Sequence, residues 1–186
     1  MLTAVQHRID REQDGFTLIE LMVVLLIIAI LLAIAIPTFI GARQTANARF
    51  TQENLRNALT AEQTNWTSLQ TFSTNLSSGE TSLVWEATGP VKGAVDVFAT
   101  TYNFGNSAPV TVGPSDSVLL EGFSRDDNCY AIFQSDNPTA DFTSYLEEAS
   151  ASNACPPIAP PAAAPSPGTT ASTNAGGSDG GWSASF

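Results

Sequence analysis

The chain has very few positive charges beyond its first third. After Asn57 it has 13 acidic residues, but only Lys92 and Arg125 are basic, and the resulting balance of −11 equals the formal charge of the whole protein. A surface of this sign repels phosphate backbones, so direct binding of nucleic acid by this region is disfavoured. The simplest interpretation is an acidic, well-hydrated surface that keeps an exported domain soluble.

Residues that commonly build catalytic and metal sites are also scarce. The chain has one histidine, His7, and two cysteines, Cys129 and Cys155, which form no CxxC motif. It also has no glycine-rich phosphate-binding loop. These absences argue against thiol redox chemistry and nucleotide binding. Any ATP-driven motor that acts on this chain must therefore be a separate protein.

Several oxygen-bearing side chains gather in one late stretch of the chain and are candidates for a hard cation such as calcium. They are Asp126, Asp127, Asn128, Asp136 and Asp141. Their spacing matches no recognised calcium loop, and Asp and Asn are common at turns. We therefore assign no metal ligand and expect no cofactor.

The segment from Phe16 to Ile36 is apolar and contains one charge, Glu20. As a helix it would span about 31 Å, which matches a hydrocarbon core of about 30 Å. A secretory signal is an alternative, because Ala33-Ile34-Ala35 resembles a signal-peptidase site, although the apolar core of a signal is shorter. A plain membrane anchor explains the length but gives Glu20 no role, and a carboxylate in such a span is costly.

Gly15, Phe16 and Glu20 resemble the processing site of type IV prepilins and pseudopilins. In that family a dedicated peptidase cuts after the glycine, the new terminal residue is N-methylated, and a glutamate lies five residues in. The resemblance implies cleavage between Gly15 and Phe16 and methylation of Phe16. It extends through the apolar run to Pro37, where the family usually has a proline that kinks the helix.

The resemblance also implies a role for Glu20 in assembly. In the family, the glutamate of one subunit is thought to pair with the terminal amine of its neighbour, so that two groups that are costly in a dry environment neutralise each other. Leader removal would then be obligatory, because Phe16 has no α-amine before the cut. The alternative is that Glu20 lies at the headgroup boundary, since it is only one turn inside the segment.

We expect an α+β, pilin-like fold in four parts. These are a cytoplasmic leader that is removed (1–15), a long helix (16–71) with a transmembrane segment (16–36), an antiparallel sheet domain (72–155) and a disordered tail (156–186). Strands are predicted near 95–99, 118–123 and 129–133, with an edge strand at 142–146, a turn at 125–128 and a short apolar segment at 83–85. Pro37 predicts a bend in the helix.

The end of the chain has two features of its own. Cys129 and Cys155 can form a disulfide if this region is exported or remain thiols if it is not, and the resemblance supports a bond. In the segment 156–186, 26 of 31 residues are Pro, Ala, Gly, Ser or Thr, which predicts disorder. Its large apolar residues, Trp182 and Phe186, either dock on a neighbouring subunit or are incidental.

Taken together, these features predict a structural subunit and not an enzyme. Leader removal would delete His7, so the mature chain would have no imidazole, and we assign no catalytic residue. The expected partners are copies of itself in a filament, minor pilins, a prepilin peptidase that is also an N-methyltransferase, and an inner-membrane assembly platform with its ATPase. The expected location is the cytoplasmic membrane, with the N-terminus in the cytoplasm, and then an extracellular filament. The alternative is a membrane-anchored adhesin that does not polymerise.

Overall fold

The computed structural model describes residues 15–93, 96–105, 108–110, 113–150, 154–164 and 181–186. The chain divides into two compact units, one that ends at Ala42 and one that runs from Arg43 to Phe186. We describe each unit by itself. Of the predicted leader, only Gly15 lies among the described residues.

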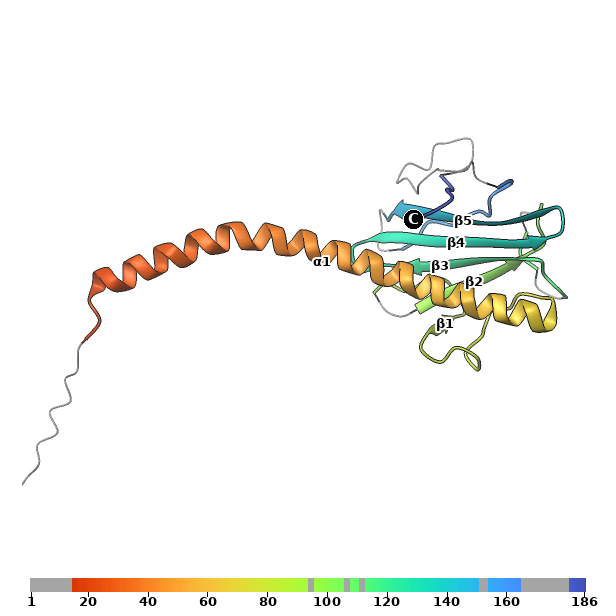
Figure 1. Ribbon diagram of the computed structural model, residues 1–186, viewed down its shortest axis with the longest axis horizontal. Coiled ribbons are helices and arrows are strands. Elements are labelled where there is room, and N and C mark those ends of the chain that lie inside the picture. Colours follow the sequence, from red (N-terminus) through yellow and green to blue (C-terminus); the bar gives the residue numbers. More distant parts are fainter. Residues whose placement is uncertain (1–14, 94–95, 106–107, 111–112, 151–153, 165–180) are drawn as a thin grey trace, which may run out of the picture. The chain divides into compact units, whose positions relative to one another are not determined.

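The helix α1 runs from Leu18 to Leu69 and confirms the long N-terminal helix (Figure 1). In the first unit every residue from 15 to 42 is exposed, so its apolar side chains have no cover from this unit. By length and composition, α1 is the one helix in the described part of the chain that is suited to cross a membrane.

The helix is assigned without a break at Pro37. Proline has no N–H group, so the carbonyl of Ala33 lacks its usual helical donor. The Thr38 hydroxyl donates to the carbonyls of Ala35 (2.9 Å) and Ile34 (3.2 Å) on the same turn. The bend that we expect at Pro37 stays a prediction.

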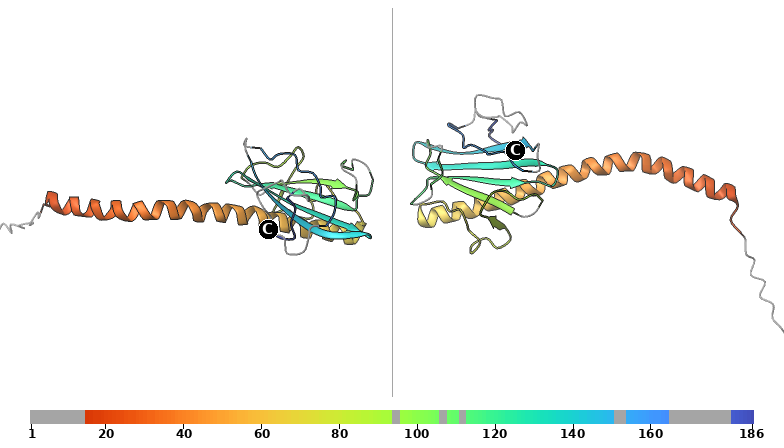
Figure 2. Two further views of the ribbon diagram at one scale, coloured as in Figure 1. Left: turned by 90° about the horizontal axis from the view of Figure 1, so that it is seen from above. Right: turned by 180° about the vertical axis from the view of Figure 1, so that it is seen from behind.

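In the second unit, five strands form a single sheet in the order in which they occur in the chain (Figures 1 and 2). They are β1 (Val84–Glu86), β2 (Asp96–Tyr102), β3 (Ser117–Phe123), β4 (Asn128–Asn137) and β5 (Ala140–Ala149). Each contains or overlaps a segment that the sequence marked as apolar or strand-like. β4 and β5 extend beyond those segments, because the two strands remain paired through ladder hydrogen bonds at polar positions as well.

The expected α+β arrangement, a long helix packed on a sheet, is confirmed. The sheet is mixed and not wholly antiparallel as expected, because β1 pairs with β2 in parallel while β2 to β5 form an antiparallel meander. The chain returns past the end of β3 before β2 begins, where Lys92 forms a bridge with Phe123 and the Gly93 N–H donates to the Phe123 carbonyl (2.9 Å). This return lets β2 start in the same direction as β1.

The main core lies between the sheet and the part of α1 that belongs to the second unit. Leu55, Ala58 and Leu59 of the helix pack in one cluster with residues of β2, β3 and β4 such as Val97. The helix comes so close that a Cβ added at Gly122 of β3 would lie 2.9 Å from the Thr51 methyl carbon. A side chain at position 122 would therefore push the helix off the sheet.

The C-terminal segment covers the opposite face of the sheet. Ile158 and Trp182 are buried in a second cluster with side chains from β2 to β5, namely Tyr102, Leu119, Ala131, Phe133 and Leu146. The Trp182 Nε1–H donates to the Ala159 carbonyl (3.2 Å). Ser183 pairs with Tyr145 on the free edge of β5, through hydrogen bonds of 2.8 and 2.9 Å.

The expectation that 156–186 is disordered is therefore wrong for residues 156–164 and 181–186, while 165–180 lie outside the described residues. The prediction of disorder came from the average composition of the tail, which gives little weight to three large apolar side chains. Ile158, Trp182 and Phe186 have an apolar sheet face or its edge to cover, and covering it removes apolar area from water.

The two cysteines form a disulfide, Cys129–Cys155, with Cα atoms 5.6 Å apart and a sequence separation of 26. The bond ties the start of β4 to the beginning of the C-terminal segment. By the chain-entropy model, closing a loop of this length stabilises the fold by about 3.5 kcal/mol.

Removing this bond should destabilise the second unit by about that amount. We expect a Cys129→Ala/Cys155→Ala variant to unfold at a clearly lower denaturant concentration than the wild type. Wild-type protein in reductant provides the matched control, because it loses the bond but keeps both sulfur atoms. Unchanged midpoints in both samples would contradict the prediction.

Candidate processing and assembly site

The predicted cleavage junction lies in an exposed, irregular segment directly before α1. Gly15, Phe16 and Thr17 have no regular secondary structure, and Phe16 is 88% exposed. Apart from its chain neighbours, no atom of the described residues lies within 4 Å of the place where a Cβ would stand at Gly15. An irregular, uncovered segment with a glycine is a backbone that a protease cleft can accept. Cleavage here would place the new terminus two residues before the helix begins.

Glu20 takes part in a capping box at the start of α1. The Thr17 backbone N–H donates to Glu20 Oε2 (2.9 Å), and the Glu20 N–H donates to Thr17 Oγ1 (3.3 Å). The Thr17 hydroxyl also donates to Oε2 (2.8 Å). Each side chain thus satisfies a backbone donor that the helix leaves without a partner.

Sequence reasoning did not anticipate this cap, although its signal is in the sequence. Thr17-Leu18-Ile19-Glu20 has the S/T-x-x-E pattern that precedes an apolar helical run. The cap gives Glu20 a role within its own subunit. It also holds the Glu20 carboxylate against Thr17, on the turn of the helix nearest to Phe16.

The first turn of α1 is a favourable place for the Glu20 carboxylate, because it is the positive end of the helix dipole. The unsatisfied N–H groups of the first turn favour a negative charge there, and Oε2 is occupied by Thr17. Oε1 makes no hydrogen bond within the described part of the chain. One oxygen of Glu20 can therefore accept from a cationic group while the other maintains the cap.

The oxygen-rich residues considered for calcium are divided between opposite ends of β4. Asp126 and Asp127 lie at the turn before it, and Asn128 is its first residue. Asp127 forms an ion pair with Lys92, and Asp126 accepts from the Ser124 hydroxyl. Asp136 and Asp141 face each other at the other end, in the β4–β5 register. No group of three potential ligands forms among the described residues.

The comparison with protein families gives one match. The family described as the prokaryotic N-terminal methylation motif matches residues 10–36, a span that contains the junction, Glu20 and the apolar segment up to Ile36. Comparisons with curated proteins and with solved structures find no match.

Proposed function

We propose, from a chain that carries a type IV pilin-like prepilin motif, that this protein is a structural subunit of an extracellular pilus or pseudopilus filament. The observation that supports the proposal is the motif match over residues 10–36. This span contains Gly15 and Phe16, which are exposed and lie immediately before a capped, apolar helix. A prepilin peptidase would cut the junction and methylate Phe16.

The apolar half of α1 supports this role. Apart from Glu20 and Thr38, its side chains from Leu18 to Ile40 form an exposed apolar surface on all sides of the helix, which suits lipid before assembly and a bundle of identical helices afterwards. The second unit is a folded acidic domain with a disulfide, as expected for a part that faces an oxidising exterior. We place the leader in the cytoplasm and this domain outside.

Assembly would require partners that the chain itself does not supply. These are the peptidase and N-methyltransferase, an inner-membrane platform, a separate assembly ATPase and minor pilins that start or end the filament. Within this class the protein is a major pilin, a minor pilin or a pseudopilin. Its abundance in sheared filaments would distinguish a major pilin from the other two.

The direct test is mass spectrometry of the N-terminus of the mature protein. We expect a chain that begins at an N-methylated Phe16. A start near Ile36 would instead show secretory cleavage after Ala35. Filaments whose subunits retain residues 1–15 would refute the proposal.

A further inference from the structure

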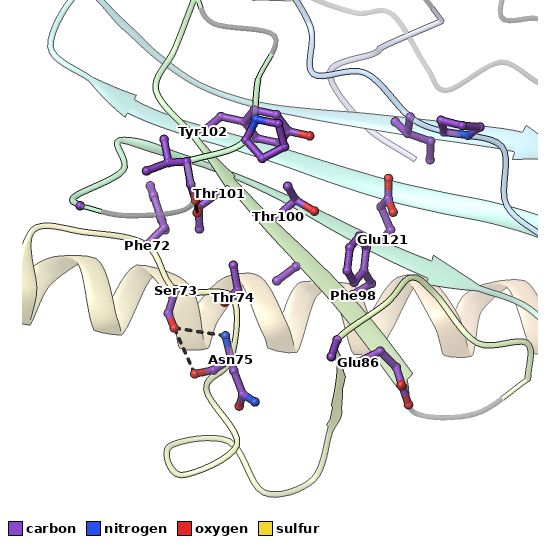
Figure 3. Close-up of a pocket in the computed structure, with 17 residues that line it drawn as sticks. Phe72, Ser73, Thr74, Asn75, Glu86, Phe98, Thr100, Thr101, Tyr102 and Glu121 are labelled. Atoms are coloured by element: carbon purple, nitrogen blue, oxygen red, sulfur yellow. Dashed lines mark hydrogen bonds between the residues drawn. The ribbon is translucent and has the colours of Figure 1, made fainter.

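A cavity of about 880 Å³ lies beside β2, beyond the short stretch that pairs with β1, and its lining comes from both faces of the sheet. Its walls come from the segment after α1, from β2 and β3, and from the C-terminal segment (Figure 3). The apolar lining includes Phe98, Tyr102 and Ile158, and Thr100 and Thr101 add hydroxyl groups. A volume of this size is typical of small-molecule sites, which range over about 300–1,000 Å³.

Glu121 is the unusual residue of this cavity. It belongs to β3, is only 7% exposed, and lines the cavity next to Phe98, with which it is paired across the strands. Figure 3 shows its carboxyl group beyond the Phe98 ring, directed away from the helix. Its carboxylate has no hydrogen-bond partner within the described residues, and burial raises its pKa to about 7.

The fold gives no internal reason for a carboxylate at this position. Neighbours on the same face of the sheet, Leu119 and Ala131, belong to the apolar cluster that Ile158 and Trp182 cover. A buried acid without a partner costs free energy, whereas an apolar residue would extend that layer. The simplest explanation for an acid at this position is that a bound molecule pairs with its carboxylate.

The charge of the residues that line the cavity indicates which kind of molecule would pair with Glu121. Of the 17 residues that line the cavity, none is basic, and Glu86 is a second acid. The cavity therefore attracts cations and repels phosphates and carboxylates. Tyr102 and Phe98 present aromatic rings beside Glu121, and such rings bind both apolar groups and cations.

We propose that this cavity binds a small organic cation, an ammonium group on an aromatic or aliphatic body. The ammonium N–H groups would donate to Glu121, while the body would pack against Phe98, Tyr102 and Ile158. The inference does not rest on filament assembly. It requires only the folded second unit, so its failure would leave the proposed function unaffected.

The test compares 2-phenylethylamine with 2-phenylethanol, which has nearly the same shape but no positive charge. Binding to the full chain in detergent micelles at pH 8, where Glu121 is ionised, would be followed through the backbone amide signals of Thr100 and Tyr102. We expect the amine to bind about tenfold or more tightly than the alcohol, as a charge-assisted hydrogen bond predicts. A Glu121→Gln variant should lose this preference.

A matched control is available in Glu62→Gln. Glu62 is also a buried acid and does not itself line the cavity, although it accepts from the N–H of Ser73, which does. Gln at position 62 can still accept from the Ser73 N–H, so this variant should keep the cavity wall and bind the amine as the wild type does. Equal binding of amine and alcohol, no binding of either, or an unchanged preference in Glu121→Gln would each overturn the proposal. The Glu62→Gln control also separates a specific loss from a general effect of removing a buried charge.

Discussion

A Glu20→Gln variant should be cleaved after Gly15 and remain in the membrane, yet form few or no filaments. Gln can replace Glu in a capping box, so the hydrogen bonds with Thr17 are kept and the helix still begins at the same place. The variant removes the negative charge and replaces the second carboxylate oxygen with an NH2 group, which cannot accept from a cation. In the proposed assembly that charge neutralises the α-amine of a neighbouring Phe16, and in its absence the amine would be buried without a partner.

The experiment measures three properties of the same cells. N-terminal mass spectrometry reports cleavage, membrane fractionation reports retention, and the yield of sheared filaments reports assembly. Thr17→Val is the matched control, because it removes the hydroxyl from the cap but keeps the Glu20 charge, and it should still assemble. Wild-type filament yield from Glu20→Gln would show that the charge has no role in docking.

The stability of the second unit should decrease as pH rises from about 5 to about 8. Glu62 is fully buried on α1, where one carboxylate oxygen accepts from the Ser73 N–H (3.0 Å) and the other has no partner among the described residues. Burial raises the pKa of Glu62 to about 7, against 4.5 for a free glutamate, although the Ser73 hydrogen bond opposes the shift. Glu121 is shifted in the same direction by burial.

The direction of this pH dependence follows from which state of the chain, folded or unfolded, binds the Glu62 proton more tightly. The folded state keeps the Glu62 proton up to about pH 7, whereas the unfolded chain releases it near pH 4.5. The stabilisation is therefore fully present below pH 4.5 and is lost as pH rises through 7. For Glu62 the loss is on the order of 3 kcal/mol, which corresponds to a lowering of the unfolding temperature by roughly 10 °C.

Thermal unfolding of the full chain at pH 5 and pH 8 measures this difference. The fluorescence of Trp66, Trp85 and Trp182 reports on the second unit, to which all three belong. Glu62→Gln cannot ionise, so it should reduce the difference between the two pH values. Glu53→Gln, an exposed position on the same helix, should leave the difference unchanged. An equal pH response in wild type and Glu62→Gln would rule out Glu62 as its source.

The elements that the sequence predicted well are those with a strong local pattern. The apolar run before Pro37 and the strand-like segments around Val118 and Cys129 appear as α1, β3 and β4. The turn at 125–128 is also present, with Asp127 at φ 66° between the two strands. Periodicity and turn chemistry act over a few residues, so both can be recognised before the fold is known.

The parts that could not be predicted depend on distant contacts. The direction of β1 is decided by the return of the chain past Phe123, and a three-residue strand carries no sign of it. The packing of Trp182 depends on a sheet face that only the whole fold creates. The cap formed by Thr17 differs, because its signal is local: Thr17 and Glu20 have the spacing of a capping box in the sequence itself.

The packing of Phe186 has a consequence for how the protein can be labelled. The Phe186 ring packs edge-on against Tyr130 and Tyr145, and the Arg56 guanidinium of α1 lies 5.6 Å from its centre. Position 186 is therefore part of the packing of the second unit. A fluorescent tag or affinity sequence inserted directly after Phe186 would start at this contact and compete with it, so a label placed there would perturb the domain that it is meant to report on.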